Sequence, residues 1–187
     1  DWNDERTWEY LADKRFSRIA LPSHGLSDDE LEMMLNKARE TGLLNKVFFY
    51  VWDEPTKTNE YEQIKTLSDR IHRYAPEAKV LTTFYCGPTD GEHKDDLFAV
   101  FDILNGATSI YCTGVWALQD NENRSEQCKA KLKSGQEWWS YVCMSNTPGL
   151  ASNSTAIGNR ATMWRNYKEQ NSGFLYWVVN GFASVYP

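Results

Sequence analysis

Helix-like and strand-like patterns of apolar residues alternate along the chain. Ser27-Asp28-Asp29-Glu30 has the composition of a capping box, in which a side chain at each end satisfies a free backbone N–H at the start of a helix. From Leu31 onward, apolar residues recur at i, i+3, i+4 and i+7, the spacing of one helix face, and Gly42 is placed to end that helix. The next apolar stretch, Lys46–Trp52, is nearly continuous and is therefore typical of a strand buried on both faces of a parallel sheet.

The same reading of the whole chain predicts six strands, each preceded by a helix. The predicted strands span residues 16–21, 46–52, 79–85, 109–112, 137–143 and 174–179. The predicted helices lie at residues 8–12, 28–41, 64–74, 95–101, 119–132 and 156–167.

Such regular alternation indicates a parallel α/β architecture, either doubly wound or a barrel. Neither G-x-G-x-x-G nor G-x-x-x-x-G-K-[ST] occurs, and their absence from the sequence favours the barrel. We therefore expect residues 1–187 to form a single, partial α/β domain of the (β/α)8 TIM-barrel type with about six βα units. Of the adjacent Trp138 and Trp139, one should face the barrel interior and the other the helix layer.

Composition narrows the function classes. The chain is 41% hydrophobic, which suffices for a packed core, and its net charge of -6 argues against a nucleic-acid groove. No apolar run approaches the ~20 residues that a membrane-spanning helix needs, and the charged start, Asp1–Arg6, is unlike a signal peptide. Eight Trp residues are unusual, because indole rings often line ligand grooves.

Cysteine and histidine spacing gives no metal-site signal. The four cysteines lack C-x-x-C spacing and the three histidines are scattered, so we expect no zinc site and no other cofactor. Four cysteines are also too few for a disulfide scaffold in a chain of this length, which favours free, buried thiols.

The strongest candidate for chemistry is Asp53-Glu54, which directly follows a predicted strand and precedes Pro55. Functional residues of barrels gather where strands end at the C-terminal face. Successive strand residues point to opposite faces, so both carboxylates reach one site only where the chain turns. A crowded carboxylic acid that keeps its proton near neutrality can protonate a glycosidic oxygen. The alternative is a solvated pair at the start of the next helix.

Aromatic side chains stand at most of the other predicted strand ends. They are candidates for stacking on a sugar ring or enclosing its substituents, and an asparagine is a candidate for bonding a hydroxyl; barrel packing is the alternative for each. These substrate-binding candidates are Tyr85, Trp116, Tyr141, Trp177 and Asn180.

The segment that contains the two acids is Tyr50-Val51-Trp52-Asp53-Glu54-Pro55. It resembles, most clearly of several stretches, the catalytic domain of glycoside hydrolase family 123 and the wider DUF4091 group. Gly135–Cys143 resembles the seventh-strand segment, Arg160–Trp164 the helix after it, and Gly173–Asn180 the last strand. The resemblance extends in order from about Leu26 to Asn180.

This resemblance implies a retaining exo-hydrolase of the β-N-acetylgalactosaminidase type that uses substrate-assisted catalysis through an oxazolinium ion. Asp53 would orient the 2-acetamido group, and Glu54 would be the general acid and then the general base. The implied partner is a glycan or glycoconjugate, and the implied location of the full-length protein is extracytoplasmic, secreted or periplasmic.

Two alternatives to this function remain open. One is a non-catalytic glycan-binding barrel fragment that keeps the aromatic residues. The other is a glycosidase for a different sugar, which would need a second carboxylate from Asp90, Glu92 or Asp120.

Length also sets an expectation, because a complete (β/α)8 barrel typically takes about 250 residues. We expect the first strand to precede Asp1 and the final helix to follow Pro187. Leu21–Ser27 is too short for the βα unit expected between the second and fourth strands. Open sheet edges would favour self-association.

Overall fold

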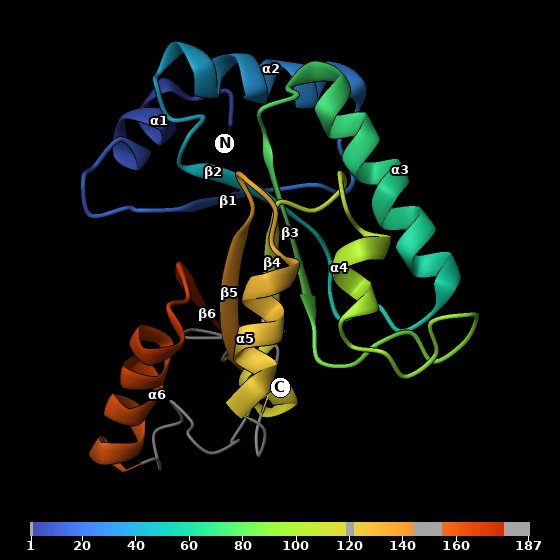
Figure 1. The fold of residues 1–187 in the computed structure, drawn as a ribbon. Helices are drawn as coiled ribbons and strands as arrows, with labels where there is room; N and C mark the ends of the chain where they lie inside the picture. The colour runs from blue at the N-terminus through green and yellow to red at the C-terminus, as the bar shows by residue number, and fades with distance from the viewer. Residues whose placement is uncertain (1, 119–121, 144–154, 178–187) are drawn as a thin grey trace, which may run out of the picture.

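The computed structural model describes residues 2–118, 122–143 and 155–177, which form a curled half-barrel of six parallel strands (Figure 1). The strands follow chain order across the sheet, and each is preceded by a helix, as predicted. The strands are β1 (Ile19–Leu21), β2 (Val47–Trp52), β3 (Lys79–Phe84), β4 (Ile110–Gly114), β5 (Glu137–Cys143) and β6 (Gly173–Trp177). The helices are α1 (Glu5–Leu11), α2 (Asp28–Glu40), α3 (Thr58–Tyr74), α4 (Ala99–Ile103), α5 (Glu122–Lys131) and α6 (Ala156–Glu169), with a 3-10 turn, η1, at Val115–Leu118.

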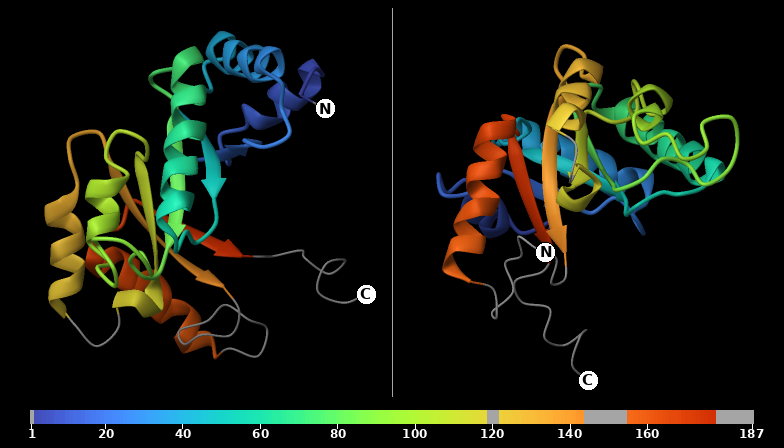
Figure 2. Two further views of the ribbon diagram at one scale, coloured as in Figure 1. Left: turned by 90° about the vertical axis from the view of Figure 1, so that its right-hand side faces the viewer. Right: turned by 60° about the horizontal axis from the view of Figure 1, so that its bottom comes forward.

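The helices lie along the outer face of the sheet, and the strands curve around the inner face (Figure 2). The predicted incomplete barrel is therefore confirmed. At α2 the capping box forms as expected, because the Ser27 hydroxyl accepts from the Glu30 amide while the Glu30 carboxylate accepts from Ser27. None of the helices within the described ranges is both long and apolar enough to span a bilayer.

Two sequence-based expectations about the elements are wrong. The helix predicted to open at Asp95 begins only at Ala99, because Asp95 has a φ of 64° and so cannot belong to a right-handed helix. No gap separates the first two strands, since Ile19 pairs directly with Val47 in parallel register. The link at Leu21–Ser27 holds no further βα unit, as its length predicted, and the unit expected between these two strands has no place in the sheet, where they are neighbours.

Side-chain alternation divides the core into two layers. Trp138 belongs to the large cluster between sheet and helices, and its indole N–H donates to the buried Thr113 hydroxyl at 2.9 Å. Trp139 belongs to the inner cluster on the concave face, where its ring meets Phe48 edge-on at 5.5 Å. The prediction that the two rings face opposite ways is confirmed. The four cysteines are free thiols, two of them buried and two half-buried.

Charged groups close the N-terminal end of the concave face. Arg18, just before β1, donates to Glu137 at 2.8 Å, and Lys79 at the start of β3 donates to the same carboxylate oxygen. The Trp139 indole N–H donates to the other oxygen at 2.9 Å. Burial disfavours the charged Glu137 carboxylate, but the bonds from Lys79 and Trp139 and the Arg18 charge outweigh it and hold its pKa below the ordinary value. Glu137 thus ties together the starts of three strands.

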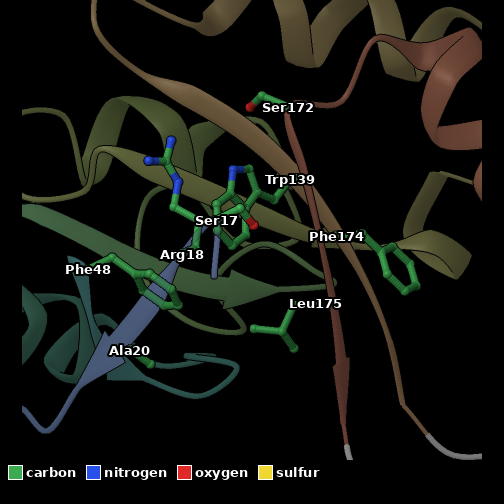
Figure 3. A pocket seen from close by; sticks show the side chains of 9 residues that line it. Ser17, Arg18, Ala20, Phe48, Trp139, Ser172, Phe174 and Leu175 are labelled. Carbon is green, nitrogen blue, oxygen red and sulfur yellow. The ribbon is translucent and has the colours of Figure 1, made fainter. Parts of the chain in front are cut away.

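Beside this charged cluster, the concave face opens between the two sheet edges, β1 and β6 (Figure 3). A cavity of about 540 Å³ lies there, and its apolar lining residues include Phe48, Trp139 and Leu175. Gly173 borders it and allows the Trp139 ring to approach, because a Cβ at this position would lie 2.3 Å from an indole carbon. Self-association through the open edges stays a prediction.

Glu137→Gln should lower the free energy of unfolding by about 1–3 kcal/mol at pH 7, since it leaves two cations without their shared carboxylate. Because the folded pKa lies below the ordinary 4.5, this stabilisation is full above about pH 4.5 and is lost as pH falls through the folded pKa. Chemical denaturation of both proteins at pH 7 and pH 3 measures the difference.

Glu126→Gln is the control, because Glu126 also pairs with a lysine but its side chain is 70% exposed. Equal losses for the two variants at pH 7, or a Glu137 effect that grows at low pH, would contradict the role given to this cluster.

Candidate active site

A break in the register of β2 directs Asp53 toward the barrel interior. Tyr50 pairs with Leu81, but the next pair joins Trp52 to Thr82, so Val51 is an extra residue in β2. Tyr50 faces the inner cluster, whereas Val51 and Trp52 both pack against the outer one. Without the extra residue, alternation would send Asp53 outward; with it, Asp53 returns to the side of Tyr50.

Side chains that follow β1 satisfy the backbone of this irregular segment. The Ser23 hydroxyl donates to the Tyr50 carbonyl at 2.7 Å. His24 Nε2 lies 3.0 Å from the Val51 carbonyl, an arrangement that requires the proton on Nε2. The loop after β1 therefore stabilises the bulge in β2.

Two hydroxyls hold one oxygen of Asp53. Tyr50 donates to Oδ1 at 2.5 Å and Thr83 of β3 at 3.0 Å, and these two hydroxyls also lie 2.9 Å apart. Burial, together with the hydrogen bond to Asp53, raises the pKa of Tyr50, so its phenol stays protonated as a donor. Among the described residues, both of these side-chain bonds end on Asp53 Oδ1, and Asp53 is an exposed residue.

Glu54 is held through its backbone and through one carboxylate oxygen. Its φ of 50° lies in the left-handed region, a conformation that costs a non-glycine residue roughly 1–3 kcal/mol and persists only where the surroundings enforce it. The Glu54 amide donates to the Thr83 hydroxyl at 3.1 Å, and Tyr141 of β5 donates to Glu54 Oε1. Burial and the Glu54 carboxylate raise the pKa of Tyr141, which also keeps that phenol protonated.

An aromatic wall continues from Tyr141 across the strand ends. The Tyr141 ring is 2% exposed and meets the edge of Trp116 at 5.0 Å, and Trp116 in turn lies 6.2 Å from Tyr85. Gly114 allows Trp116 to fold over the end of β4, since a Cβ there would lie 2.9 Å from the indole. Tyr85 is 38% exposed and Trp116 is half-buried, so these two rings present the accessible faces.

The structure thus brings together five of the seven candidates: Asp53, Glu54, Tyr85, Trp116 and Tyr141. The backbone of Trp177 pairs with Cys143 at the end of β6, beside the site. The side chain of Trp177 and all of Asn180 lie outside the described residues. Sequence reasoning missed Tyr50 and Thr83, whose roles depend on the bulge and on the register between β2 and β3.

A cysteine nucleophile and a metal site are less well supported around these acids. Cys86 and Cys143 lie near the acids, but burial and the Glu54 charge raise the pKa of both thiols and so disfavour the nucleophilic thiolate. Within residues 2–118, 122–143 and 155–177, no group of three His, Cys, Asp or Glu side chains is arranged to hold a metal ion.

The carboxylate of the loop acid Asp90 is hydrogen-bonded at the start of α3. Its carboxylate accepts from the Thr58 amide at 2.8 Å and from the Thr58 hydroxyl at 2.7 Å, which caps the start of α3. These bonds lower the pKa of Asp90. Glu92 is exposed, and Asp120 lies outside the described residues.

The fold and the site together define a class: an incomplete (β/α) barrel with paired carboxylates and an aromatic wall at the C-terminal ends of its strands. Residues 26–185 match the family described as "Glycoside hydrolase 123, catalytic domain", and the chain belongs to this family. The suspected family resemblance is therefore confirmed, and it supports glycoside hydrolysis as the general activity.

Comparison with other known proteins adds little about function. No curated protein matches the chain significantly. One matching crystal structure, from Silicibacter pomeroyi DSS-3, is of a protein described as a glycerophosphoryl diester phosphodiesterase. It shares 10% identity at a TM-score of 0.46, over 85% of this chain and 46% of that one. The chain thus spans less than half the length of that protein.

Glycine should be more stable than alanine at position 54, the reverse of the usual order. At a positive φ, Glu54→Gly avoids the Cβ strain that Glu54→Ala retains, so we expect the glycine variant to be more stable by about 1 kcal/mol. Thermal unfolding of the two variants measures the difference, and both lose the Tyr141 bond equally.

The same pair of substitutions at Glu62, exposed on α3, is the control. There alanine should be the more stable by about 1 kcal/mol, because glycine weakens a helix interior. The same sign at both positions would show that residue 54 does not have the left-handed backbone.

Proposed function

We propose that this chain is the catalytic part of a retaining exo-glycoside hydrolase that removes β-linked N-acetylhexosamine, with N-acetylgalactosamine the best candidate. One observation carries the proposal: neighbouring carboxylates are each held through a single oxygen by interior hydroxyls. In this proposal the other oxygen of each acid contacts the substrate. Family membership supports the general activity, and the sugar and the mechanism are inferred from the resemblance of the Asp53-Glu54 segment.

In the first proposed step, the carbonyl oxygen of the sugar's own 2-acetamido group attacks the anomeric carbon. The glycosidic C–O bond breaks as Glu54 gives its proton to the leaving oxygen. Asp53 accepts a hydrogen bond from the acetamide N–H, which orients the carbonyl and stabilises the positive charge of the oxazolinium ion. Neighbouring residues suffice because the protein supplies no nucleophile to the far face of the ring.

In the second step, water attacks the anomeric carbon while Glu54 takes one of its protons. The bond between the anomeric carbon and the acetamide oxygen breaks, which restores the acetamide and leaves the sugar with its original configuration. Glu54 thus ends protonated, as it began. Two successive inversions at one carbon give net retention.

The aromatic wall fits the apolar face of a sugar ring. Tyr85 and Trp116 are proposed to stack on the sugar, whereas Tyr141 acts beneath them through its bond to Glu54. Trp177 and Asn180 are proposed as further contacts. An extracytoplasmic location for the full-length protein stays part of this proposal.

The direct test is release of 4-nitrophenol from 4-nitrophenyl β-N-acetylgalactosaminide. Glu54→Gln should lower the rate by about 10²–10⁴-fold, since it removes the general acid–base. Glu62→Gln, an exposed carboxylate on α3, is the control and should retain the wild-type rate. Turnover by wild type at the same rate as Glu54→Gln would exclude the assignment. Calorimetric binding of the sugar without turnover would instead favour a glycan-binding module.

Participation of the acetamide group makes a separate prediction. Replacing the acetamide by a hydroxyl, as in 4-nitrophenyl β-galactoside, removes the internal nucleophile and should abolish measurable hydrolysis. The corresponding acetamido-thiazoline should inhibit competitively, and Asp53→Asn should weaken that inhibition more than it weakens binding of galactose. Comparable hydrolysis of both glycosides would overturn the substrate-assisted mechanism and point to a different sugar.

A further inference from the structure

We propose that Thr83 is a positioning residue that fixes both acids of the site through one hydroxyl. This inference rests on the proposed function for its catalytic consequence, but its structural part stands independently. Thr83 lies on β3, and its side chain is 1% exposed, so water does not compete for its hydrogen bonds.

The hydroxyl contacts the two acids in different ways. Its oxygen accepts from the Glu54 amide at 3.1 Å and also lies 3.0 Å from Asp53 Oδ1. The single Tyr50 proton is committed to Asp53 across 2.5 Å, so the Thr83 proton is directed to Asp53 Oδ1 or to the Tyr50 oxygen. In either arrangement, one side chain of β3 holds the Glu54 backbone and the Asp53 carboxylate network together.

This connection matters because the Glu54 backbone is in the left-handed region. Such a conformation persists only where neighbouring groups enforce it. The Glu54 amide, whose hydrogen bond the Thr83 hydroxyl accepts, belongs to the peptide between Asp53 and Glu54. A rotation of that peptide would therefore move both carboxylates at once. A misplacement of about 1 Å can lower a rate by 10²-fold even where every catalytic group is present.

The neighbouring Thr82 supplies a matched control. It is also fully buried on β3, and its hydroxyl is hydrogen-bonded to the Thr108 hydroxyl at 2.9 Å, with no contact to either acid. Valine at either position keeps the shape of threonine and removes one buried hydroxyl. The two substitutions therefore remove similar groups and differ in what those groups hold.

The first readout is kinetic, with the 4-nitrophenyl β-N-acetylgalactosaminide as substrate. Thr83→Val should lower kcat by about 10²-fold with KM changed by less than about 3-fold, because misplacement affects the reacting geometry more than binding. Thr83→Ser retains the hydroxyl and should restore most of kcat. Thr82→Val should keep the wild-type kcat even where its melting temperature falls as far. Equal kcat for the two valine variants would overturn the proposal.

The second readout needs no activity and separates this proposal from the proposed function. Amide hydrogen exchange at Glu54, followed by NMR, should be slow in wild type, Thr83→Ser and Thr82→Val, and at least ~10-fold faster in Thr83→Val. If the wild type hydrolyses nothing but this pattern holds, the proposed function fails and the positioning role stands. Unchanged exchange in Thr83→Val overturns the positioning role. Thr83→Ala, compared with Thr82→Ala, replaces the valine pair if valine prevents folding.

Discussion

The extra residue in β2 is the constraint on which the site depends. A parallel strand that is buried on both faces sends successive side chains to opposite sides, and that rule alone would separate Tyr50 from Asp53. The break at Val51 reverses the alternation, so both side chains reach the concave face and share a hydrogen bond. Ser23 and His24 then satisfy the carbonyl groups of the irregular segment. A local backbone irregularity thus places Asp53 on the side of Tyr50, where the Thr83 hydroxyl contacts both the Asp53 carboxylate and the Glu54 amide.

The two ends of the barrel interior have different physical characters. At the N-terminal end, Glu137 draws Arg18 and Lys79 together and joins three strand starts. At the C-terminal end, Glu54 is in a strained backbone conformation and its partners are neutral hydroxyls. Opposite charges meet at one end. At the other end, protonated phenols with raised pKa values bind the two acids without carrying an opposite charge, Tyr50 that of Asp53 and Tyr141 that of Glu54. That division matches the usual separation of stability and function in barrels.

The open side of the half-barrel borders the inner apolar cluster, whereas the residues that bind Asp53 and Glu54 lie on strands away from that opening. The cavity between β1 and β6 is lined in part by the inner apolar cluster, at Phe48, Trp139 and Leu175. The contacts of Asp53 and Glu54, in contrast, come from β2, β3 and β5, which lie within the sheet. The hydrogen bonds that define the site are therefore independent of what lies beyond the two edges. Substrate contacts on the open side would, in contrast, involve residues near β6, at the edge of the sheet.

Local pattern determined much of this protein from sequence alone. Apolar periodicity and the capping box predicted α2, the strand Glu137–Cys143 and the parallel α/β class, because these features depend on neighbours a few residues apart. The sequence also predicted that Asp53-Glu54 lies at a strand end, because Pro55 marks the turn. Only the tertiary structure decided that Tyr50 and Thr83 hold Asp53 and that Tyr141 holds Glu54. Those contacts depend on the shifted register of β2 and on residues as far as 87 positions apart in the sequence. No short-range sequence pattern encodes the register shift or the long-range contacts.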